Sequence, residues 1–270
     1  MAIVRQYKSY RFKKSRPLLR VGLALLPAAA WLPAQGQRAA VVSVEHTRLL
    51  VDSRYDTAGD SAAAAFLRPY SHAVDSVMGR VAGRAAAPLR AYRPESPLSN
   101  LLADILLDAG PAFGERPQLA VLNMGGIRAS LPQGEVTCGD LLQVAPFENR
   151  ICFLTLSGES LLQLFREIAA SGGEAVSRGV ELVITPGGRL KSARLGGRPI
   201  DPAGSYRIAT ISYLAEGNDR LSALRRQSGL NAPRTRGSDT RRIIAGYFSR
   251  AAERGVAVDA RVEGRIRVEE

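Results

Sequence analysis

The sequence predicts an α+β sandwich formed by a single domain. Apolar residues recur at helical spacing in several segments, and short apolar strands stand between them without strict strand–helix–strand alternation. Of the 270 residues, 46% are hydrophobic and 23% are charged, which is enough for a sizeable buried core. Because neither an internal repeat nor a long linker interrupts the sequence, we expect one folded unit.

The N-terminal part of the sequence has the pattern of a secretory signal peptide. Seven of the 37 basic residues fall within the first twenty positions, with no acidic residue among them. The apolar stretch VGLALLPAAAWLPAQG follows and ends in small residues around Gly36. This order predicts a signal peptide over 1–36 and an exported protein, periplasmic or secreted. A short membrane anchor is the alternative for an apolar stretch of this length.

The remaining sequence divides into a lead-in over 37–59, which contains a strand over 40–51, and a main domain over 60–270. Without the signal peptide the net charge falls from +12 to +5. A balance this close to neutral does not indicate a nucleic-acid partner. We also expect no stable membrane span once the signal peptide is removed.

Two amphipathic helices are predicted in the first part of the domain. The first begins near Asp60, and we expect its apolar stripe to pack on another element. That stripe consists of Phe66, Tyr70, Val74, Val77 and Val81. The second helix lies in SPLSNLLADILLDAG and is stopped by Gly110-Pro111. Its apolar face consists of Leu98, Leu101, Leu102, Ile105 and Leu106.

The middle of the domain alternates strands with capped helices. The stretch QLAVLN predicts a short buried strand. Thr137, with Asp140 three residues later, predicts a capping box at the start of a short helix. RICFLTL is the next predicted strand, and Ser157 is expected to cap the helix that follows it.

The last third of the sequence is richer in strands. The region 180–214 is expected to be mostly strand, with hairpin turns at Gly187-Gly188 and Gly196-Gly197. A helix over 240–251 and a final strand over 262–268 complete the predicted domain.

Common catalytic patterns are absent from the sequence. His46 and His72 are the two histidines, and neither has a second ligand at metal-binding spacing. The G-x-S-x-G and P-loop patterns do not occur. Cys138 and Cys152 are the two cysteines, and we slightly favour free thiols over a disulfide in a chain of this length.

The stretch VLNMGGIRAS combines the features of a ligand-binding loop. Asn123 follows a short strand, and Gly125 and Gly126 permit a ligand to approach backbone N–H groups closely. Arg128 adds a guanidinium suited to phosphate or carboxylate. On spacing alone, a plain turn with a surface arginine accounts for the same residues.

Two further loops carry aromatic residues next to polar ones. Phe147 lies in VAPFENR, between a predicted helix and a strand, and Tyr213 with Asp219 lies in ISYLAEGNDR at a strand end. Taken singly, each ring is explained as the edge of a core and the aspartate as a turn residue.

Taken together and in order, these stretches resemble the C-terminal, substrate-binding domain of the 5'-nucleotidase family. The resemblance covers about 66–267. Its motifs are FLRPYSHAVDSVMGRV, ESPLSNLLADILLDA, NMGGIRASLPQGEVTCGDLLQVAPFENRICFLTLSGESLLQLF, VSRGVELVIT, YRIATISYLAEGND and EGRI. The long middle motif is specific, because N-x-GGIR, a Pro-Phe about twenty residues later and an L-x-G helix start recur in the family as one unit.

The resemblance implies a four-layered α/β/β/α sandwich that grips the nucleoside of a substrate. By similarity, Phe147 and Tyr213 would stack on the base, Asp219 would accept a hydrogen bond from the nucleoside, and Asn123 with Arg128 would bind phosphate. The implied substrate-binding residues are Asn123, Gly125, Gly126, Arg128, Phe147, Tyr213, Asp219 and Arg93.

The sequence departs from the family pattern at several places. Met124 replaces a small residue, GNDR stands where Gly-Gly-Asp-Gly is common, and Arg93 lies one place from the family's additional arginine. Full-length members also carry an N-terminal metallophosphoesterase domain that holds two metals, and we expect this chain to work without one of its own.

The resemblance leads to two functional hypotheses. In the first, the chain is the nucleotide- or nucleoside-binding half of a split 5'-nucleotidase and serves nucleotide catabolism. A separate metallophosphoesterase chain would complete it, so that no cofactor is expected in this chain and divalent metals are expected in that partner. The alternative is a stand-alone, non-catalytic nucleotide-binding or scaffold protein. Hydrolysis by this chain alone has little support. The one acid–base pair that could be suggested is Glu216 with Asp219, and both lie in a polar turn where nothing obvious perturbs the pKa of either carboxyl group.

Overall fold

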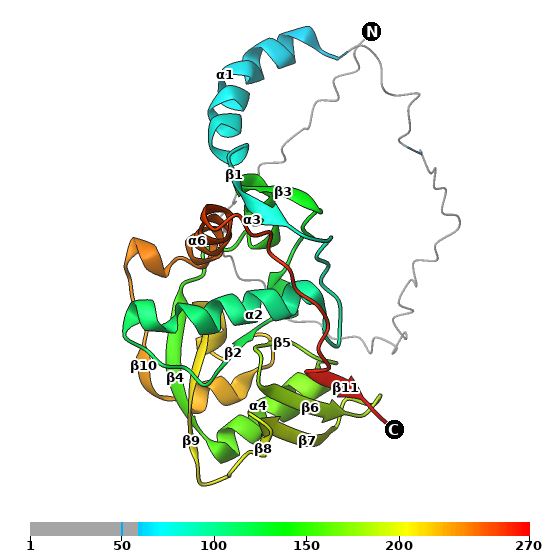
Figure 1. Cartoon of the computed structure of the whole chain (residues 1–270), viewed down its shortest axis with the longest axis vertical. Helices are drawn as coiled ribbons and strands as arrows, with labels where there is room; N and C mark the ends of the chain where they lie inside the picture. The colour runs from blue at the N-terminus through cyan, green and yellow to red at the C-terminus, as the bar shows by residue number, and fades with distance from the viewer. Residues whose placement is uncertain (1–49, 51–58) are drawn as a thin grey trace, which may run out of the picture. The chain divides into compact units, whose positions relative to one another are not determined.

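Three β-sheets organise the part of the chain that the structure, a computed structural model, describes: residue 50 and residues 59–270 (Figure 1). The five-stranded sheet has the order β10-β4-β9-β2-β5, the four-stranded sheet β11-β6-β7-β8, and the ribbon β1-β3. The strands are β1 (Val81–Ala85), β2 (Leu119–Leu122), β3 (Gly134–Thr137), β4 (Ile151–Ser157), β5 (Ala175–Val176), β6 (Val180–Ile184), β7 (Leu190–Leu195), β8 (Arg198–Pro199), β9 (Ser205–Ile211), β10 (Ser228–Asn231) and β11 (Ile266–Val268).

Helices connect and cover these sheets. The α-helices are α1 (Ser61–Met78), α2 (Pro97–Ala109), α3 (Cys138–Val144), α4 (Gly158–Ala170), α5 (Ser212–Ala215) and α6 (Thr240–Glu253). Short 3-10 turns lie at η2 (Gly110–Phe113), η3 (Met124–Gly126), η4 (Ser222–Arg226) and η5 (Arg236–Ser238). The mixture of helices with several sheets confirms the predicted α+β class.

The centre of the five-stranded sheet is buried on both faces. β4 and β9 pair antiparallel in an unbroken register from Ile151↔Ile211 to Ser157↔Ser205, and β2 runs parallel to β9. Every residue of β2 is buried, as are the first four residues of β4. Because successive strand residues point to opposite faces, continuous burial means that both faces are covered.

Helix α2 lies between the two hydrophobic cores of the domain. Ala103 and Leu106 belong to the core that contains β2, β4 and α4. Four other buried apolar residues face the second core, which contains α3, α6 and the ribbon; they are Leu98, Leu101, Leu102 and Ile105. All five leucine and isoleucine residues of the predicted apolar face are therefore buried, as expected.

The predicted helix starts and turns are confirmed by local hydrogen bonds. The Thr137 hydroxyl accepts from Asp140 N at 3.1 Å, and the Asp140 carboxylate accepts from Thr137 N at 2.8 Å, which completes the capping box. Ser157 caps α4 by accepting from Ser160 N at 3.3 Å. The two predicted glycine pairs stand in the β6–β7 and β7–β8 turns. The final strand is shorter than predicted, because pairing with β6 begins at Ile266.

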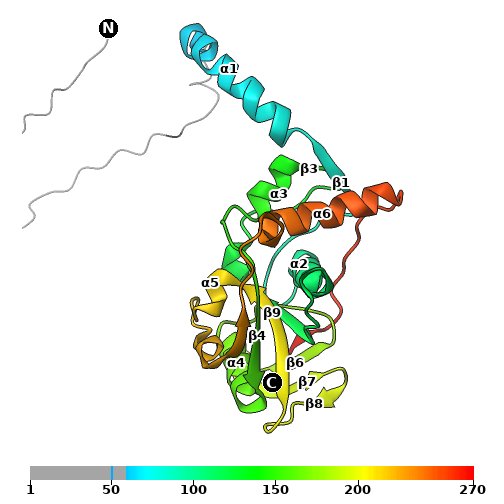
Figure 2. The ribbon, with the colours of Figure 1, turned by 90° about the vertical axis from the view of Figure 1, so that its left-hand side faces the viewer.

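The expected packing of the first helix is wrong within the described residues. α1 forms with Asp60 as its N-cap, as predicted, but none of its residues is buried. Figure 2 shows the helix extending away from the sheets beyond β1. Four of the five stripe residues are exposed on it, and Val81 lies past its end in β1; the four are Phe66, Tyr70, Val74 and Val77. An apolar stripe indicates that a face favours burial, but it does not tell what covers that face.

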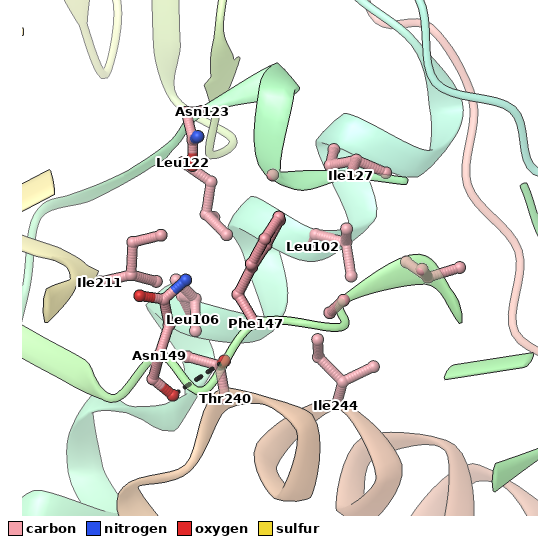
Figure 3. Close-up of a pocket in the computed structure, with 13 residues that line it drawn as sticks. Leu102, Leu106, Leu122, Asn123, Ile127, Phe147, Asn149, Ile211, Thr240 and Ile244 are labelled. Carbon is pink, nitrogen blue, oxygen red and sulfur yellow. Dashed lines mark hydrogen bonds between the residues drawn. The ribbon is translucent and has the colours of Figure 1, made fainter. Parts of the chain in front are cut away.

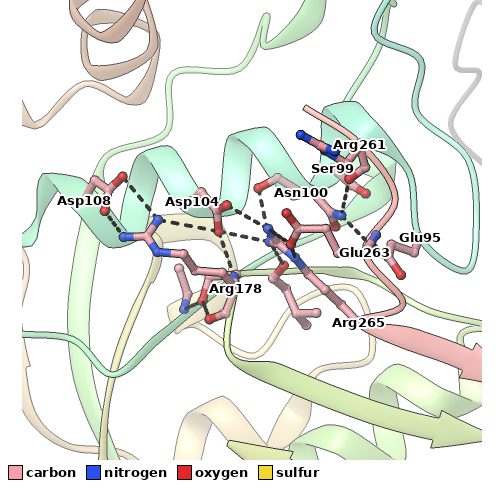
Figure 4. Close-up of polar contacts among 12 residues, drawn as sticks. Glu95, Ser99, Asn100, Asp104, Asp108, Arg178, Arg261, Glu263 and Arg265 are labelled. Carbon is pink, nitrogen blue, oxygen red and sulfur yellow. Dashed lines mark hydrogen bonds and ion pairs between the residues drawn. The ribbon is translucent and has the colours of Figure 1, made fainter. Parts of the chain in front are cut away.

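A buried polar cluster holds the end of the chain against α2 (Figure 4). Arg265 is 4% exposed and donates to the Asp104 carboxylate at 2.7 and 2.9 Å and to the Val176 carbonyl at 2.9 Å. Glu95, also 4% exposed, accepts from Asn100 Nδ2 at 2.7 Å and from Ile266 N at 3.2 Å. Both buried charges are therefore compensated, as low-dielectric surroundings require.

Some expectations concern residues that the structure does not describe, and others concern the two cysteines and a membrane span. The signal peptide over 1–36, the strand over 40–51 and His46 lie outside the described residues. Cys138 and Cys152 are both free, and burial raises the pKa of the Cys152 thiol to about 11. Among the residues described, no helix combines the length and apolarity needed to cross a membrane.

One ion pair predicts how stability changes with pH. Arg207 on β9 donates to both oxygens of Glu115, at 2.6 and 2.8 Å, and Asn231 Nδ2 donates at 2.8 Å. The hydrogen bond from Arg207 holds the pKa of Glu115 below its usual value. This stabilisation is present above the unfolded-state pKa and is lost as pH falls through the lower folded-state pKa.

We expect Glu115→Gln to lower the free energy of unfolding by about 1 kcal/mol at pH 6 and by less at pH 3. Urea denaturation of both proteins at the two pH values measures the difference. Exposed Glu253→Gln serves as the control and should change neither value. An equal loss for Glu115→Gln at both pH values would contradict the ion-pair explanation.

Candidate functional site

The ends of three neighbouring strands bring the predicted site residues to one edge of the five-stranded sheet. Asn123 directly follows β2, and Tyr213 follows the end of β9. Phe147 precedes the start of β4. Because β9 is parallel to β2 and antiparallel to β4, these three positions belong to the same edge.

A cavity of about 420 Å³ opens at this edge, which is within the range of small-molecule sites. It is lined by Asn123, Gly125, Gly126, Phe147, Glu148, Asn149, Tyr213 and Asp219. Both rings are exposed, Phe147 to 50% and Tyr213 to 41%. Aromatic faces left open beside a cavity are available to stack on a planar ligand.

Asp219 ties the two sides of the cavity together. Its Oδ1 accepts from the Tyr213 hydroxyl at 3.0 Å, and its Oδ2 accepts from Asn123 Nδ2. The hydrogen bond to Asp219 raises the pKa of the Tyr213 phenol, so that this hydroxyl stays a donor. Asn123 is 5% exposed, and its Oδ1 is buried without a hydrogen-bond partner among the described residues.

The turn that carries Asp219 is held in a left-handed conformation. Asp219 has φ 53° and Arg220 has φ 63°. Aspartate tolerates this region, whereas a longer side chain such as arginine adopts it at a cost. Asn218 Nδ2 donates to the Tyr213 carbonyl at 2.8 Å and closes the turn. The conformation aims Asp219 toward Tyr213 and Asn123.

The glycine loop is supported from behind by a buried carboxylate. Glu174, 4% exposed, accepts hydrogen bonds from Met124 N in the loop and from the Arg93 guanidinium. Arg93 Nε also donates to the Gly173 carbonyl at 2.7 Å. Burial raises the pKa of Glu174, although both hydrogen bonds oppose that rise. Arg93 therefore supports the loop that forms the cavity wall and does not line the cavity.

The loop before β4 is fixed by contacts at its base. Thr240, at the start of α6, donates to the Asn149 carbonyl from N at 3.0 Å and from Oγ1 at 3.1 Å. Ser212 N donates to the Arg150 carbonyl at 2.8 Å, which extends the β4–β9 pairing. Phe147 also lines a smaller cavity of about 30 Å³. Figure 3 shows its ring among apolar side chains; those labelled include Leu102, Leu106, Ile127 and Ile244.

The structure thus brings six of the eight predicted site residues to one cavity. They are Asn123, Gly125, Gly126, Phe147, Tyr213 and Asp219. Arg128 is outside the lining, is exposed, and donates to the Gly125 carbonyl at 3.3 Å. Arg93 is outside it as well, for the reason given above.

Sequence reasoning missed three residues of the site. Glu148 and Asn149 line the cavity, and both directly follow Phe147 in the motif VAPFENR. Glu174 supports the glycine loop, and the sequence contained no signal for it, because its place depends on the pairing of β5 with β2. Antiparallel pairing of β5 with β2 places Glu174 beside Asn123.

The described residues do not fit a metal centre. Within 59–270, no group of three or more His, Cys, Asp or Glu side chains is arranged to hold a metal ion. Of the two carboxylates at the cavity, Asp219 accepts from Tyr213 and Asn123, and Glu148 lies 3.7 Å from the Arg241 guanidinium. The described site can bind, orient and hydrogen-bond a planar ligand.

Comparison with known proteins adds a family to this geometry. Residues 77–226 match the family described as 5'-nucleotidase, C-terminal domain. An apyrase of Tabanus yao is 34% identical over 127 residues, which cover 40% of this chain and 23% of the apyrase. Protein UshA of Salmonella pullorum is 32% identical over 123 residues, 44% of this chain and 21% of UshA. The matched part thus spans about a fifth of the length of these relatives.

Solved structures share the fold. The 5'-nucleotidase precursor of Thermus thermophilus superposes with a TM-score of 0.66 at 27% identity, over 77% of this chain and 43% of that one. The NAD nucleotidase of Haemophilus influenzae has a TM-score of 0.54 at 19% identity, over 78% and 41% of the two chains. The predicted fold class is therefore confirmed.

The strained turn predicts a stabilising substitution. Because Arg220 is exposed and has a positive φ, we expect Arg220→Gly to raise the free energy of unfolding by about 0.5–1 kcal/mol. Thermal and urea unfolding measure the change. Arg226→Gly, in a 3-10 turn without a positive φ, is the matched control and should lower stability. Equal destabilisation by both variants would show that the turn stores no such strain.

Proposed function

This chain belongs to the 5'-nucleotidase C-terminal domain family, and we propose on that premise that its domain binds the nucleoside part of a nucleotide. The observation that carries the proposal is the pair of exposed rings, Phe147 and Tyr213, that line one cavity of about 420 Å³. Such rings would hold a base whatever its ring substituents, since every base has a π-face. Asp219 and Asn123 supply the polar contacts.

In this proposal the roles of the predicted residues differ. Phe147 and Tyr213 stack on the base, and Asp219 accepts a hydrogen bond from the nucleoside. Gly125 and Gly126 line the cavity without side chains that would occupy it. Asn123 is less suited to phosphate than expected, because one of its two amide hydrogens already donates to Asp219 and its free atom, Oδ1, is an acceptor. Arg128, at the outer side of the loop, is the residue left for a phosphate at the rim.

We further propose that hydrolysis requires a metal centre carried by a separate metallophosphoesterase chain, so that the two chains together form a nucleotide-catabolising hydrolase. The support is the combination of a cavity with stacking rings and described residues that offer no metal-binding cluster. The signal-peptide pattern over 1–36 supports action in the periplasm or outside the cell. The second candidate is a stand-alone binding protein. A cavity with stacking rings and no metal-binding cluster among the described residues also fits a protein that binds a nucleoside without a catalytic partner.

Truncation of either ring tests the stacking proposal. We expect Phe147→Ala and Tyr213→Ala each to weaken adenosine binding by roughly 5- to 150-fold, because one stacked ring contributes about 1–3 kcal/mol. Isothermal titration calorimetry on the full chain measures the dissociation constants. Tyr70→Ala, an exposed tyrosine on α1, is the control and should bind like the unaltered chain. Unchanged affinity in both ring variants would sink the proposal.

Reconstitution tests the partner. Mixed with a metal-loaded metallophosphoesterase chain from the same source, the full chain should raise kcat/KM for AMP by at least about tenfold over that chain alone, because it would position the nucleoside. Hydrolysis is followed by released phosphate. The Phe147→Ala variant should lose most of this gain. If the unaltered chain gives no gain while it still binds adenosine, the stand-alone binding protein is the better description.

A further inference from the structure

We propose that a second cavity, formed by the start of β4, by α5 and by the segment around β10, binds a small organic carboxylate that also carries a hydroxyl group. Its volume is about 310 Å³, at the lower end of the range for small-molecule sites. This site is independent of the cavity lined by Phe147 and Tyr213, called the nucleoside cavity below. Three features carry the inference: two arginine side chains, one buried acceptor, and the charge of the lining.

The second cavity is separate from the nucleoside cavity. The two have no lining residue in common. Ile151 pairs directly with Ile211, whose side chain lines the small cavity beside Phe147. Arg150 and Cys152, on either side of Ile151 in the chain, line the second cavity and therefore belong to the opposite face of the strand pair. The β4–β9 pair thus stands between a ligand in the second cavity and Phe147.

Two arginine side chains line the second cavity without a protein partner. Within 59–270, no carboxylate or carbonyl accepts a hydrogen bond from the guanidinium of Arg150 or of Arg234. Arg225, by contrast, donates to the Glu216 carbonyl at 2.8 Å. A guanidinium presents two parallel donors that match the two oxygens of a carboxylate. A single exposed arginine is ordinarily solvated, whereas two that line one cavity offer their donors to the same anion.

The second cavity also contains a buried acceptor. Gln227 Nε2 donates to the Ala215 carbonyl at 3.1 Å, and Gln227 Oε1 is buried without a hydrogen-bond partner in the described part of the chain. A flipped amide would set Oε1 against the Ala215 carbonyl oxygen, so this orientation is fixed. A buried acceptor needs a donor, which water or a ligand hydroxyl supplies. A ligand with its own hydroxyl therefore replaces the water that it displaces.

The charge of the lining favours a monoanion. Arg150 and Arg234 contribute +2 and Glu216 contributes −1, which leaves a formal charge of +1. The Cys152 thiol is neutral near pH 7, because burial and, to a smaller extent, the charge of Glu216 raise its pKa to about 11. One carboxylate balances this charge, whereas a phosphate dianion exceeds it. Leu230, also in the lining, offers apolar surface to the carbon skeleton of the ligand.

Small probes test the ligand class. We expect 3-hydroxybenzoate or 4-hydroxybenzoate, which differ in the spacing of carboxylate and hydroxyl, to bind the full chain with a dissociation constant of about 10 mM or lower. Ligand-observed NMR titration at neutral pH measures it. The better of the two should bind at least about fivefold more tightly than benzoate, which lacks the hydroxyl, and than its own benzamide, which lacks the charge. The same advantage is expected over inorganic phosphate.

These comparisons leave the inference open to refutation. If neither hydroxybenzoate binds in this range, the second cavity is not such a site. An advantage below about fivefold over benzoate, over the benzamide or over phosphate would overturn the hydroxyl, the charge or the carboxylate assignment, and the inference with it.

Variants assign the ligand to the second cavity. Arg150→Gln and Arg234→Gln should each weaken the better hydroxybenzoate at least about fivefold and leave the affinity for its benzamide unchanged. Arg198→Gln, at an exposed arginine on β8 outside this cavity, is the matched control and should bind like the unaltered chain. Unchanged hydroxybenzoate affinity in either cavity variant would overturn the inference.

Gln227→Met tests the acceptor. Because methionine is of similar length but has no amide oxygen, the advantage of the hydroxybenzoate over benzoate should fall to within about twofold. An undiminished advantage in the folded variant would overturn the role of Gln227. Thermal unfolding shows whether the variant is folded, and the two arginine variants decide the question if it is not.

Competition distinguishes the two cavities. Saturating adenosine should leave hydroxybenzoate binding to the full chain unchanged, because the cavities share no lining residue. Displacement of the hydroxybenzoate by adenosine would place the probe in the nucleoside cavity and overturn this inference. Failure of adenosine to bind would overturn the proposed function and leave the arginine-dependent binding of the hydroxybenzoate as the support for the second cavity.

Discussion

The pairing of β9 with two neighbours of opposite direction is the constraint on which the site depends. Its parallel alignment with β2 brings the glycine loop to the edge where β9 ends, and its antiparallel alignment with β4 brings Phe147 to that same edge. β5 pairs with β2 and delivers Glu174 behind the loop. The polar cluster around Arg265 holds α2 and β11 beside this sheet, so the scaffold under the cavity is tied to the end of the chain.

Local features of the fold could be predicted from the sequence because their causes are local. The capping box at Thr137, the cap at Ser157 and the apolar face of α2 each depend on residues within a few positions of one another. The strand order could not be predicted this way, because β2, β4 and β9 meet across long stretches of chain. The same holds for α1. Its sequence pattern predicted an apolar face but could not predict which element, if any, covers that face.

For the candidate site, the motifs indicated which residues take part but not the hydrogen bonds between them. Six of the predicted residues share one cavity, yet the hydrogen bonds from Tyr213 and Asn123 to Asp219 depend on a left-handed turn that the letters GNDR do not predict. Arg93 was expected among the substrate-binding residues and instead supports Glu174. An arginine in a binding motif acts on whichever carboxylate lies nearest, and that neighbour is a property of the fold.

The depth of Cys152 has a bearing on how the protein tolerates an oxidising environment. A thiol with a pKa of about 11 exists as thiolate in about one molecule in ten thousand at neutral pH, and the thiolate is the form that attacks disulfides. The side chain is also 2% exposed. Disulfide-forming catalysts and alkylating reagents would therefore find this sulfur nearly inert while the domain stays folded, and its modification would report on unfolding.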